Sequence, residues 1–205
     1  PLAVISGATE LLLAQKDLPE KTRNRVLRIA RAARQSTDIT TALLHLVRAE
    51  RGTNQDSEAH DVSHIVEKLI HLQEPLLDKK PLELKIIGED KVNVIAPESV
   101  IAVTVGNLIS NAIRYTPAGE VVCTIGSGRL LVEDTGPGIP EKELSLVMNR
   151  HYRGEGVLGK GSGLGLAIVQ RLCELYGWSI HFENRKSGGL RAELRFFGEA
   201  REVSD

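Results

Sequence analysis

The chain has 205 residues, of which 41% are hydrophobic, 26% are charged and 3% are aromatic, and its formal net charge is -1. This near-neutral balance argues against a general nucleic-acid or anionic-membrane surface, and the scarcity of aromatic side chains argues against stacking on single-stranded nucleic acid. We therefore expect no nucleic-acid partner. No apolar run approaches the roughly 18–20 residues that span a bilayer, so we also expect no membrane contact by this chain.

The first fifty residues are expected to form a helical hairpin. Residues 2–15 carry one apolar stripe, and Pro19 suits the first turn of a second helix that runs to about Glu50. In that helix small and apolar residues recur at spacings of three, four and seven, namely Val26, Ala30, Ala33, Thr37, Thr40, Leu44 and Val47. Such a narrow seam predicts that residues 1–50 are half of a dimeric four-helix bundle. A hairpin packed on its own globular domain is the alternative.

A second domain is expected after a polar, aperiodic linker at residues 51–60. It covers residues 61–198 and leaves a tail at 199–205. The pattern predicts helices at 62–78, from Glu98 and at 164–177, and strands near 82–86, 92–94, 121–125, 129–133, 179–184 and 190–197. Helices with a mostly hairpin-connected sheet predict an α+β fold, in which an α/β sandwich keeps its helices on one face.

Histidine and cysteine contribute no predicted site. His60, His64 and His71 share roughly one helical face, but no cysteine or carboxylate completes a metal site there. Cys123 and Cys173 lie among apolar neighbours, so we expect buried, reduced thiols.

The helix that contains residues 107–117 carries the first candidate site. At 3.6 residues per turn Asn107, Asn111 and Arg114 share one face, with Tyr115 at its edge, beside an apolar stripe. An amide oxygen can coordinate a hard cation that keeps most of its waters, and a guanidinium can neutralise phosphate oxygens. The combination suits magnesium with a polyphosphate, whereas two asparagines alone are more simply interpreted as solvated helix residues.

The second candidate segment follows a predicted strand and runs from Asp134 to Ile139, with glycines at Gly136 and Gly138. A carboxylate at a strand end accepts a hydrogen bond from the exocyclic amine of adenine, where guanine presents a carbonyl. The two glycines let the backbone approach a flat base without a Cβ. Taken alone, Asp-x-Gly-x-Gly is also a common turn.

The third segment opens a predicted helix with Gly161-Ser162-Gly163-Leu164-Gly165-Leu166. Backbone amides at a helix N-terminus bind phosphate. The preceding Gly154-x-Gly156-x-x-Gly159 has the spelling of a dinucleotide fingerprint but lacks the buried strand that must precede it. A P-loop is excluded too, because a glycine follows Lys160 where Ser or Thr is required. We therefore expect residues 150–162 to form a lid that closes on nucleotide.

In this order and spacing, the three segments resemble the nucleotide-binding boxes of sensor histidine kinases, members of the Bergerat-fold superfamily shared with gyrase, chaperone and mismatch-repair ATPases. The resemblance covers residues 61–198 and implies ATP and Mg²⁺ as cofactors. It implies that Asn111 is the magnesium ligand, and that Asn107 contacts phosphate or water and is catalytic together with Arg153, which meets the γ-phosphate. The other implied ATP contacts are Arg114, Tyr115, Asp134, Gly136, Gly138, Ile139, Lys160, Gly161, Ser162, Gly163, Leu164, Gly165 and Leu166.

The start of the chain extends this resemblance. Pro1-Leu2 is similar to the end of the family's His-Glu-x-x-Thr-Pro-Leu box, which implies an acceptor histidine just upstream and a chain that does not phosphorylate itself. The resemblance implies an ATP-dependent protein-histidine kinase that dimerises through the hairpin. Its implied partner is the receiver domain of a response regulator, and its implied place is the cytoplasmic part of a membrane-anchored sensor.

One departure from the family pattern keeps other functions open. Met148 and His151 stand where the family's phenylalanine box has two phenylalanines, although Arg153 is retained. A non-catalytic module that binds adenine nucleotide is therefore one alternative. A serine protein kinase of the same superfamily is another, and the heptad-like hairpin argues against it.

Overall fold

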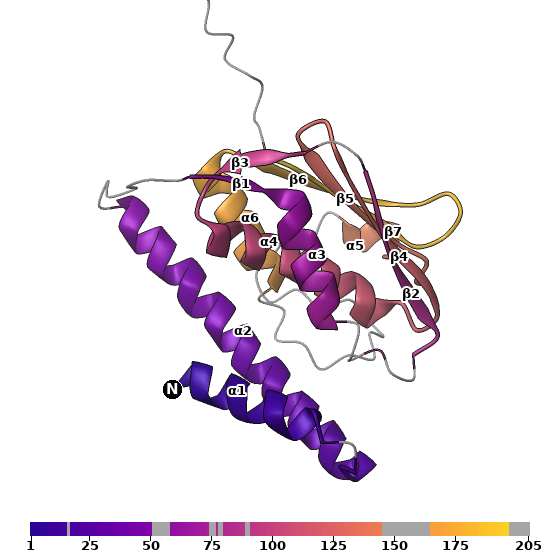
Figure 1. Ribbon diagram of the computed structural model, residues 1–205. Coiled ribbons are helices and arrows are strands. Elements are labelled where there is room, and N and C mark those ends of the chain that lie inside the picture. Colours follow the sequence, from indigo (N-terminus) through magenta and orange to yellow (C-terminus); the bar gives the residue numbers. More distant parts are fainter. Residues whose placement is uncertain are drawn as a thin grey trace, which may run out of the picture.

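The computed structural model describes residues 1–15, 17–50, 58–73, 77, 80–88, 91–144 and 165–196. It consists of a helical hairpin followed by an α/β domain whose helices cover one face of a sheet (Figure 1). The predicted α+β class, with a hairpin before an α/β sandwich, is confirmed. In the described part of the chain, no helix has the length and apolar character needed to cross a membrane.

The hairpin consists of α1 (Leu2–Leu13) and α2 (Glu20–Glu50), and α1 packs along the first half of α2 (Figure 1). Val26 and Ala33 of the predicted seam are buried. The last turn of α1 has no basic residue of its own, and Arg23 of α2 takes that role by donating to the carbonyls of Leu13 and Gln15 at 3.5 and 3.3 Å. A cation from the partner helix thus satisfies carbonyls that α1 leaves unpaired.

The second half of α2 packs on the α/β domain through a different face. Ala42 belongs to that domain's hydrophobic core. One ring nitrogen of His45 lies 3.1 Å from the Ser99 hydroxyl, and the other lies 3.4 Å from the Tyr176 hydroxyl. Helix α2 therefore packs on α1 through one face and on the α/β domain through another. The seam residues Leu44 and Val47 remain exposed.

The main sheet has the strand order β2 (Leu82–Ile87), β4 (Gly119–Gly126), β5 (Arg129–Asp134), β7 (Leu190–Arg195) and β6 (Ser179–Asn184). The last four strands pair antiparallel, as the hairpin pattern predicts. β2 and β4 are parallel, because the chain returns to the same edge of the sheet through β3 and α4.

A second, two-stranded sheet pairs β1 (Ala59–Asp61) with β3 (Asn93–Ile95). Strand β1 includes Ala59 and His60, the last two residues of the segment predicted to be a linker. A three-residue strand is too short to show a periodic pattern in sequence.

The core lies between the sheet and the helices α3 (Val62–Gln73), α4 (Glu98–Tyr115) and α6 (Gly165–Tyr176), while α5 (Glu141–Leu144) is a single turn. Fully buried residues such as Ile101, Leu130, Leu172 and Leu194 each contribute roughly 1.5–3 kcal/mol. Cys123 and Cys173 are buried free thiols, as predicted, and burial raises the pKa of each to about 12.

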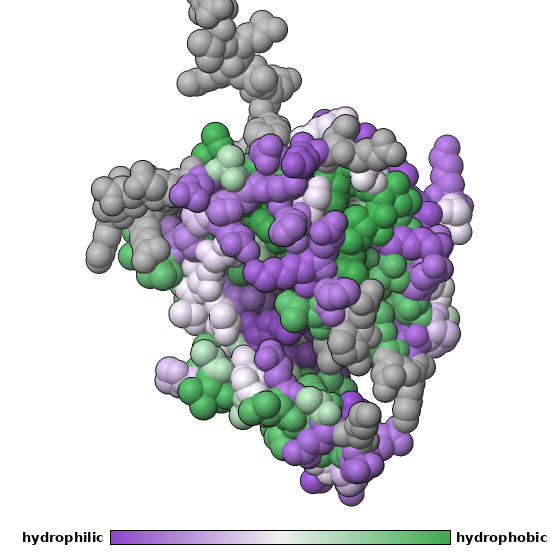
Figure 2. All heavy atoms as spheres, viewed as in Figure 1, coloured by the Kyte–Doolittle hydropathy of each residue, from purple (hydrophilic) through white to green (hydrophobic). Residues whose placement is uncertain are grey.

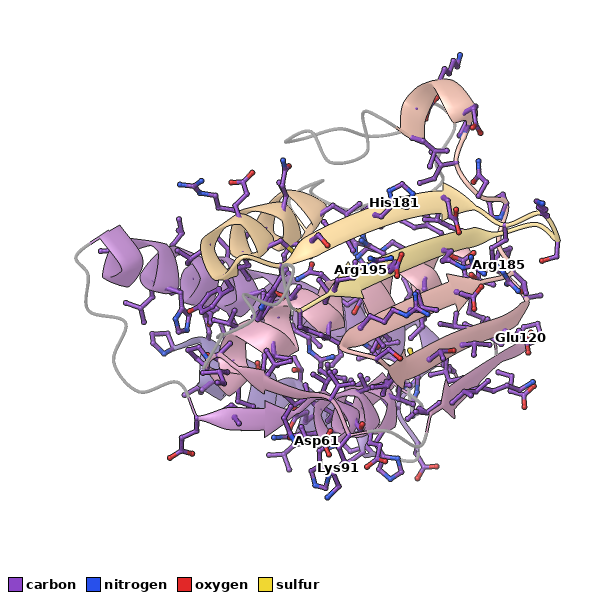
Figure 3. The ribbon with its side chains drawn as sticks, turned by 90° about the horizontal axis from the view of Figure 1, so that it is seen from above. Asp61, Lys91, Glu120, His181, Arg185 and Arg195 are labelled. Atoms are coloured by element: carbon purple, nitrogen blue, oxygen red, sulfur yellow. The ribbon has the colours of Figure 1, made fainter. Side chains whose placement is uncertain are left out.

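The opposite face of the sheet is polar and carries ion pairs both within and between its strands and turns (Figure 3). Glu133 on β5 pairs with Arg185 and Arg191, and Glu193 on β7 pairs with Arg129 and Arg195. Each carboxylate therefore separates two guanidiniums, which lets the central strands present a hydrated face without like-charge repulsion.

Candidate nucleotide-binding site

Helix α4 positions the first predicted segment. Its apolar stripe, which includes Val105 and Leu108, is buried against the core, while Asn107 and Asn111 are half-buried and Arg114 is exposed. The polar row predicted by helical spacing is thus directed away from the core. Lys80 donates to the Ile113 carbonyl and so holds the end of this helix.

Asn107 meets the third segment. Its amide nitrogen donates to the Val103 carbonyl at 2.7 Å, which directs its Oδ1 toward the start of α6. A Cβ placed on Gly165, the first residue of α6, would lie 2.5 Å from that Oδ1. A larger residue at this position would force the Asn107 side chain to shift. Gly165 and Leu166 are therefore beside the asparagine helix, as a shared site demands.

Asp134 ends β5 with a side chain that is only 5% exposed. Its Oδ1 accepts hydrogen bonds from the amides of Gly136 at 2.8 Å and Leu190 at 3.3 Å. Burial raises the pKa of this carboxyl, and the two amides together with the nearby Arg185 and Thr116 oppose the rise. The side chain is a fixed, largely desolvated acceptor, as adenine recognition needs.

The second segment is in contact with the end of α4. A Cβ on Gly136 would lie 2.9 Å from both the Tyr115 carbonyl and Asp134 Oδ1, and 3.3 Å from the Thr116 hydroxyl. Thr116 is buried and donates to the Ala112 carbonyl at 2.8 Å. The asparagine helix therefore meets the third segment at Asn107 and the second segment at its C-terminal end.

Several predicted contacts lie outside the described residues. These are Arg153, Lys160, Gly161, Ser162, Gly163 and Leu164, together with Met148 and His151 of the departing phenylalanine box. Among the residues that the structure describes, no three histidine, cysteine or acidic side chains gather to hold a metal. A magnesium ion held mainly by substrate phosphates and water needs no such cluster, and the half-buried Asn111 is a suitable amide ligand for it.

Sequence reasoning missed the residues between β6 and β7. Asn184, Arg185, Gly189 and Leu190 all contact the 134–139 loop. The sequence signal for this contact was the pair Gly188-Gly189 after a predicted strand. In the structure both glycines have φ of +92°, and a Cβ on Gly189 would collide with the Asp134 carbonyl. That signal indicates a close backbone contact without indicating the partner.

Comparison with known proteins relates the chain to a family of ATPases. The family model of the histidine kinase-, DNA gyrase B-, and HSP90-like ATPases matches residues 98–199. Sensor protein QseC of Escherichia coli is 30% identical over 203 residues, which are 95% of this chain and 44% of that protein. Sensor-type histidine kinase PrrB of Mycobacterium tuberculosis is 28% identical over 203 residues, which are 97% of this chain and 45% of that protein. The chain thus spans less than half the length of these curated relatives.

Solved structures share the fold. The mycobacterial sensor histidine kinase MprB matches with a TM-score of 0.58 and 26% identity, over 67% of this chain and 95% of that one. Full-length ShkA in complex with AMPPNP matches with a TM-score of 0.63 and 23% identity, over 98% of this chain and 44% of that one. The family match covers α4, the Asp134 loop and α6, so residues 98–199 belong to the histidine kinase-, DNA gyrase B- and HSP90-like ATPases.

Proposed function

We propose that this chain binds ATP with Mg²⁺ and transfers the γ-phosphoryl group to a histidine of a bundle helix. The observation that carries the proposal is the convergence of three separate segments, because α4 touches the Asp134 loop at one end and Gly165 near its middle. A single nucleotide can then contact all three. Phosphoryl transfer depends mainly on positioning and charge neutralisation, which these residues are suited to supply.

Each side chain has a defined part in the proposed reaction. Asp134 accepts the adenine amine, and Gly136 and Gly138 leave room for the base. Asn111 would hold the magnesium ion, which neutralises phosphate charge when bound, while Asn107 orients a phosphate or water. Further roles are assigned by resemblance alone: Tyr115 flanks the nucleotide, Arg114 faces the phosphates, and Arg153 meets the γ-phosphate. Lys160, Ser162, Leu164 and Leu166 contact ATP, while Gly161, Gly163 and Gly165 support the lid and the phosphates.

The partners of the longer protein are part of the same proposal. The phosphoryl group would pass from the histidine to an aspartate in a response-regulator receiver domain. The hairpin would dimerise, which is supported by exposed apolar side chains on both of its helices. The relatives are named sensor proteins, which supports a membrane-anchored sensor with this portion in the cytoplasm.

A phosphoryl-transfer assay tests the function. The chain is incubated with ATP labelled in the γ-phosphate, Mg²⁺ and a four-helix-bundle fragment that carries the family's histidine box. We expect acid-labile label on the bundle fragment, because phosphohistidine is hydrolysed in acid. Intact nucleotide binding without transfer would instead favour the non-catalytic module.

Two glycine variants link that assay to the convergence of the segments. Gly165→Ala places a methyl group 2.5 Å from Asn107 Oδ1, so the asparagine must shift, and a cost of roughly 1–3 kcal/mol should lower ATP affinity or transfer about fivefold or more. Gly106→Ala is the matched control, because its Cβ would make only an ordinary 3.6 Å contact with Leu69. Equal activity in both variants would contradict the proposed role of the Asn107–Gly165 contact.

A further inference from the structure

The turn between β6 and β7, residues 184–190, encloses the adenine loop, which is the segment 134–139. The Leu190 amide donates to Asp134 Oδ1 at 3.3 Å. Arg185 donates to the Asp134 carbonyl at 2.7 Å and pairs with Glu133 at 3.3 Å. Figure 3 shows Arg185 at the same end of the sheet as Glu120, where β5 also ends. The turn is therefore hydrogen-bonded to Asp134, the first residue of the adenine loop.

Asn184 grips the other end of the adenine loop. The Ile139 amide donates to Asn184 Oδ1 at 2.9 Å, and Asn184 Nδ2 donates to the Ile139 carbonyl at 2.6 Å. The side-chain amide thus pairs with Ile139 as a neighbouring strand would. Nδ2 also lies 3.4 Å from a carboxylate oxygen of Glu141, which fixes the orientation of the amide. Asparagine alone combines donor and acceptor at this length, because aspartate lacks the donor and leucine lacks both.

The loop is shaped to receive this side chain. Gly138 has φ of +70°, and a Cβ there would lie 2.6 Å from Asn184 Oδ1 and 3.3 Å from the Gly189 carbonyl. The glycine is required by its left-handed backbone and by the approach of the turn together. The turn therefore contacts the loop at both of its ends.

We propose that Asn184 is a positioning residue for adenine recognition, one that holds Gly138 and Ile139 in the nucleotide-ready conformation before the purine arrives. The inference rests on the proposed function and deepens it at the same site. Asn184 acts through its two hydrogen bonds to the Ile139 backbone. Without these two hydrogen bonds, which we call the clamp, Gly138 and Ile139 would become ordered only when the nucleotide binds. The conformational entropy lost at that point lowers adenine-nucleotide affinity by about tenfold or more.

The test compares Asn184→Ala and Asn184→Asp with the matched control His181→Ala, an exposed change on the same strand. Calorimetry of MgADP binding should show a dissociation constant raised about tenfold by Asn184→Ala, and at least as much by Asn184→Asp, whose carboxylate faces the Ile139 carbonyl and Glu141. His181→Ala should bind as the parent does. In the transfer assay the KM for ATP should rise while kcat is retained.

Amide hydrogen exchange reports the clamp directly. The Ile139 amide should exchange faster in Asn184→Ala and remain protected in Asn184→Asp, which keeps the acceptor oxygen. The double variant Asn184→Asp/Glu141→Gln removes the repulsion from Glu141 and should recover part of the lost affinity. This recovery separates positioning from general loss of folding.

The outcomes that contradict the inference are distinct from those that contradict the function. Parent and Asn184→Ala chains that bind MgADP within twofold of each other would overturn the positioning role and leave the kinase proposal intact. A parent chain that binds no MgADP would overturn the kinase proposal and the positioning role with it.

Discussion

At the residue scale, the ability of Asp134 to accept a hydrogen bond from a bound base depends on whether its carboxyl group is ionised. Its Oδ1 already accepts the amides of Gly136 and Leu190, and so the carboxylate must remain ionised to offer a further acceptor to a base. Burial acts against ionisation and raises the pKa of the group. Ionised Asp134 therefore costs folding stability, and under the proposed function it would serve as the acceptor for adenine.

We expect Asp134→Asn to weaken ADP binding about tenfold to a hundredfold. The single oxygen of asparagine is needed for the two backbone amides, which turns its NH₂ group toward the adenine amine, and a hydrogen bond to a charged group is worth roughly 1.5–3 kcal/mol. In the parent chain, ADP affinity should fall as the pH drops through the raised pKa of Asp134, sooner than for an ordinary aspartate. Calorimetry against pH checks both, and unchanged affinity in the variant would refute the adenine assignment.

At the scale of elements, helix α2 buries an aspartate, Asp38, on the face that contacts the α/β domain, and this burial lowers folding stability. Asp38 lies one turn before Ala42 on this face, and burial raises its pKa from 3.8 to about 6, against the opposing effect of Arg34. A raised pKa means that the folded chain favours the protonated carboxyl. The destabilisation by ionised Asp38 is therefore small at pH 4, grows as the pH rises from about 4 to about 6, and is complete above that.

Asp38→Asn should therefore stabilise the chain at pH 8 and have little effect near pH 4. The gap between 3.8 and about 6 corresponds to at most about 3 kcal/mol at the higher pH. Denaturant unfolding at both pH values measures the difference, with exposed Asp17→Asn as the control. A variant no more stable than its parent at pH 8 would show that Asp38 is hydrated in the folded chain.

The elements themselves differ in how far sequence could predict them. Long periodic segments such as α2 and α4 were predictable because each repeats one apolar face many times. The contact of Ala42 and His45 with the α/β domain was not, because an alanine and a histidine do not distinguish a second packing face from solvent. The asparagine row was predictable from local spacing, whereas the clamp by Asn184 joins residues 45 positions apart and leaves no local pattern.

At the scale of the whole molecule, the hairpin exposes more apolar surface than one copy can cover. On α1, Val4 and Leu11 are 74% and 75% exposed and lie seven residues apart, on one helical face. On α2, Ile29 and Leu43 are 51% and 57% exposed and lie fourteen residues apart. Figure 2 shows hydrophobic residues gathered on the hairpin below the α/β domain. Heptad spacing on both helices favours a second copy of the hairpin as the covering partner.

We expect the chain to sediment as a dimer and Leu11→Glu/Ile29→Glu to sediment as a monomer. A charge in an apolar interface must be desolvated without a partner, which disfavours association by several kcal/mol. Ile95→Glu is the control, because Ile95 is 70% exposed on β3, away from the hairpin. A parent chain that stays monomeric at high concentration, or an Ile95 variant that dissociates, would place the interface elsewhere.

The position of β7 beside β5 has a consequence for synthesis and truncation. Asn184 and Leu190 are among the last described residues to leave a ribosome, yet they complete the surroundings of a carboxylate made fifty residues earlier. A nascent or shortened chain that stops before β6 would contain both glycine-rich segments and still lack the contacts that Asn184 and Leu190 make with the 134–139 loop. Under the proposed function, nucleotide binding would therefore stabilise the domain only after β6 and β7 have been translated.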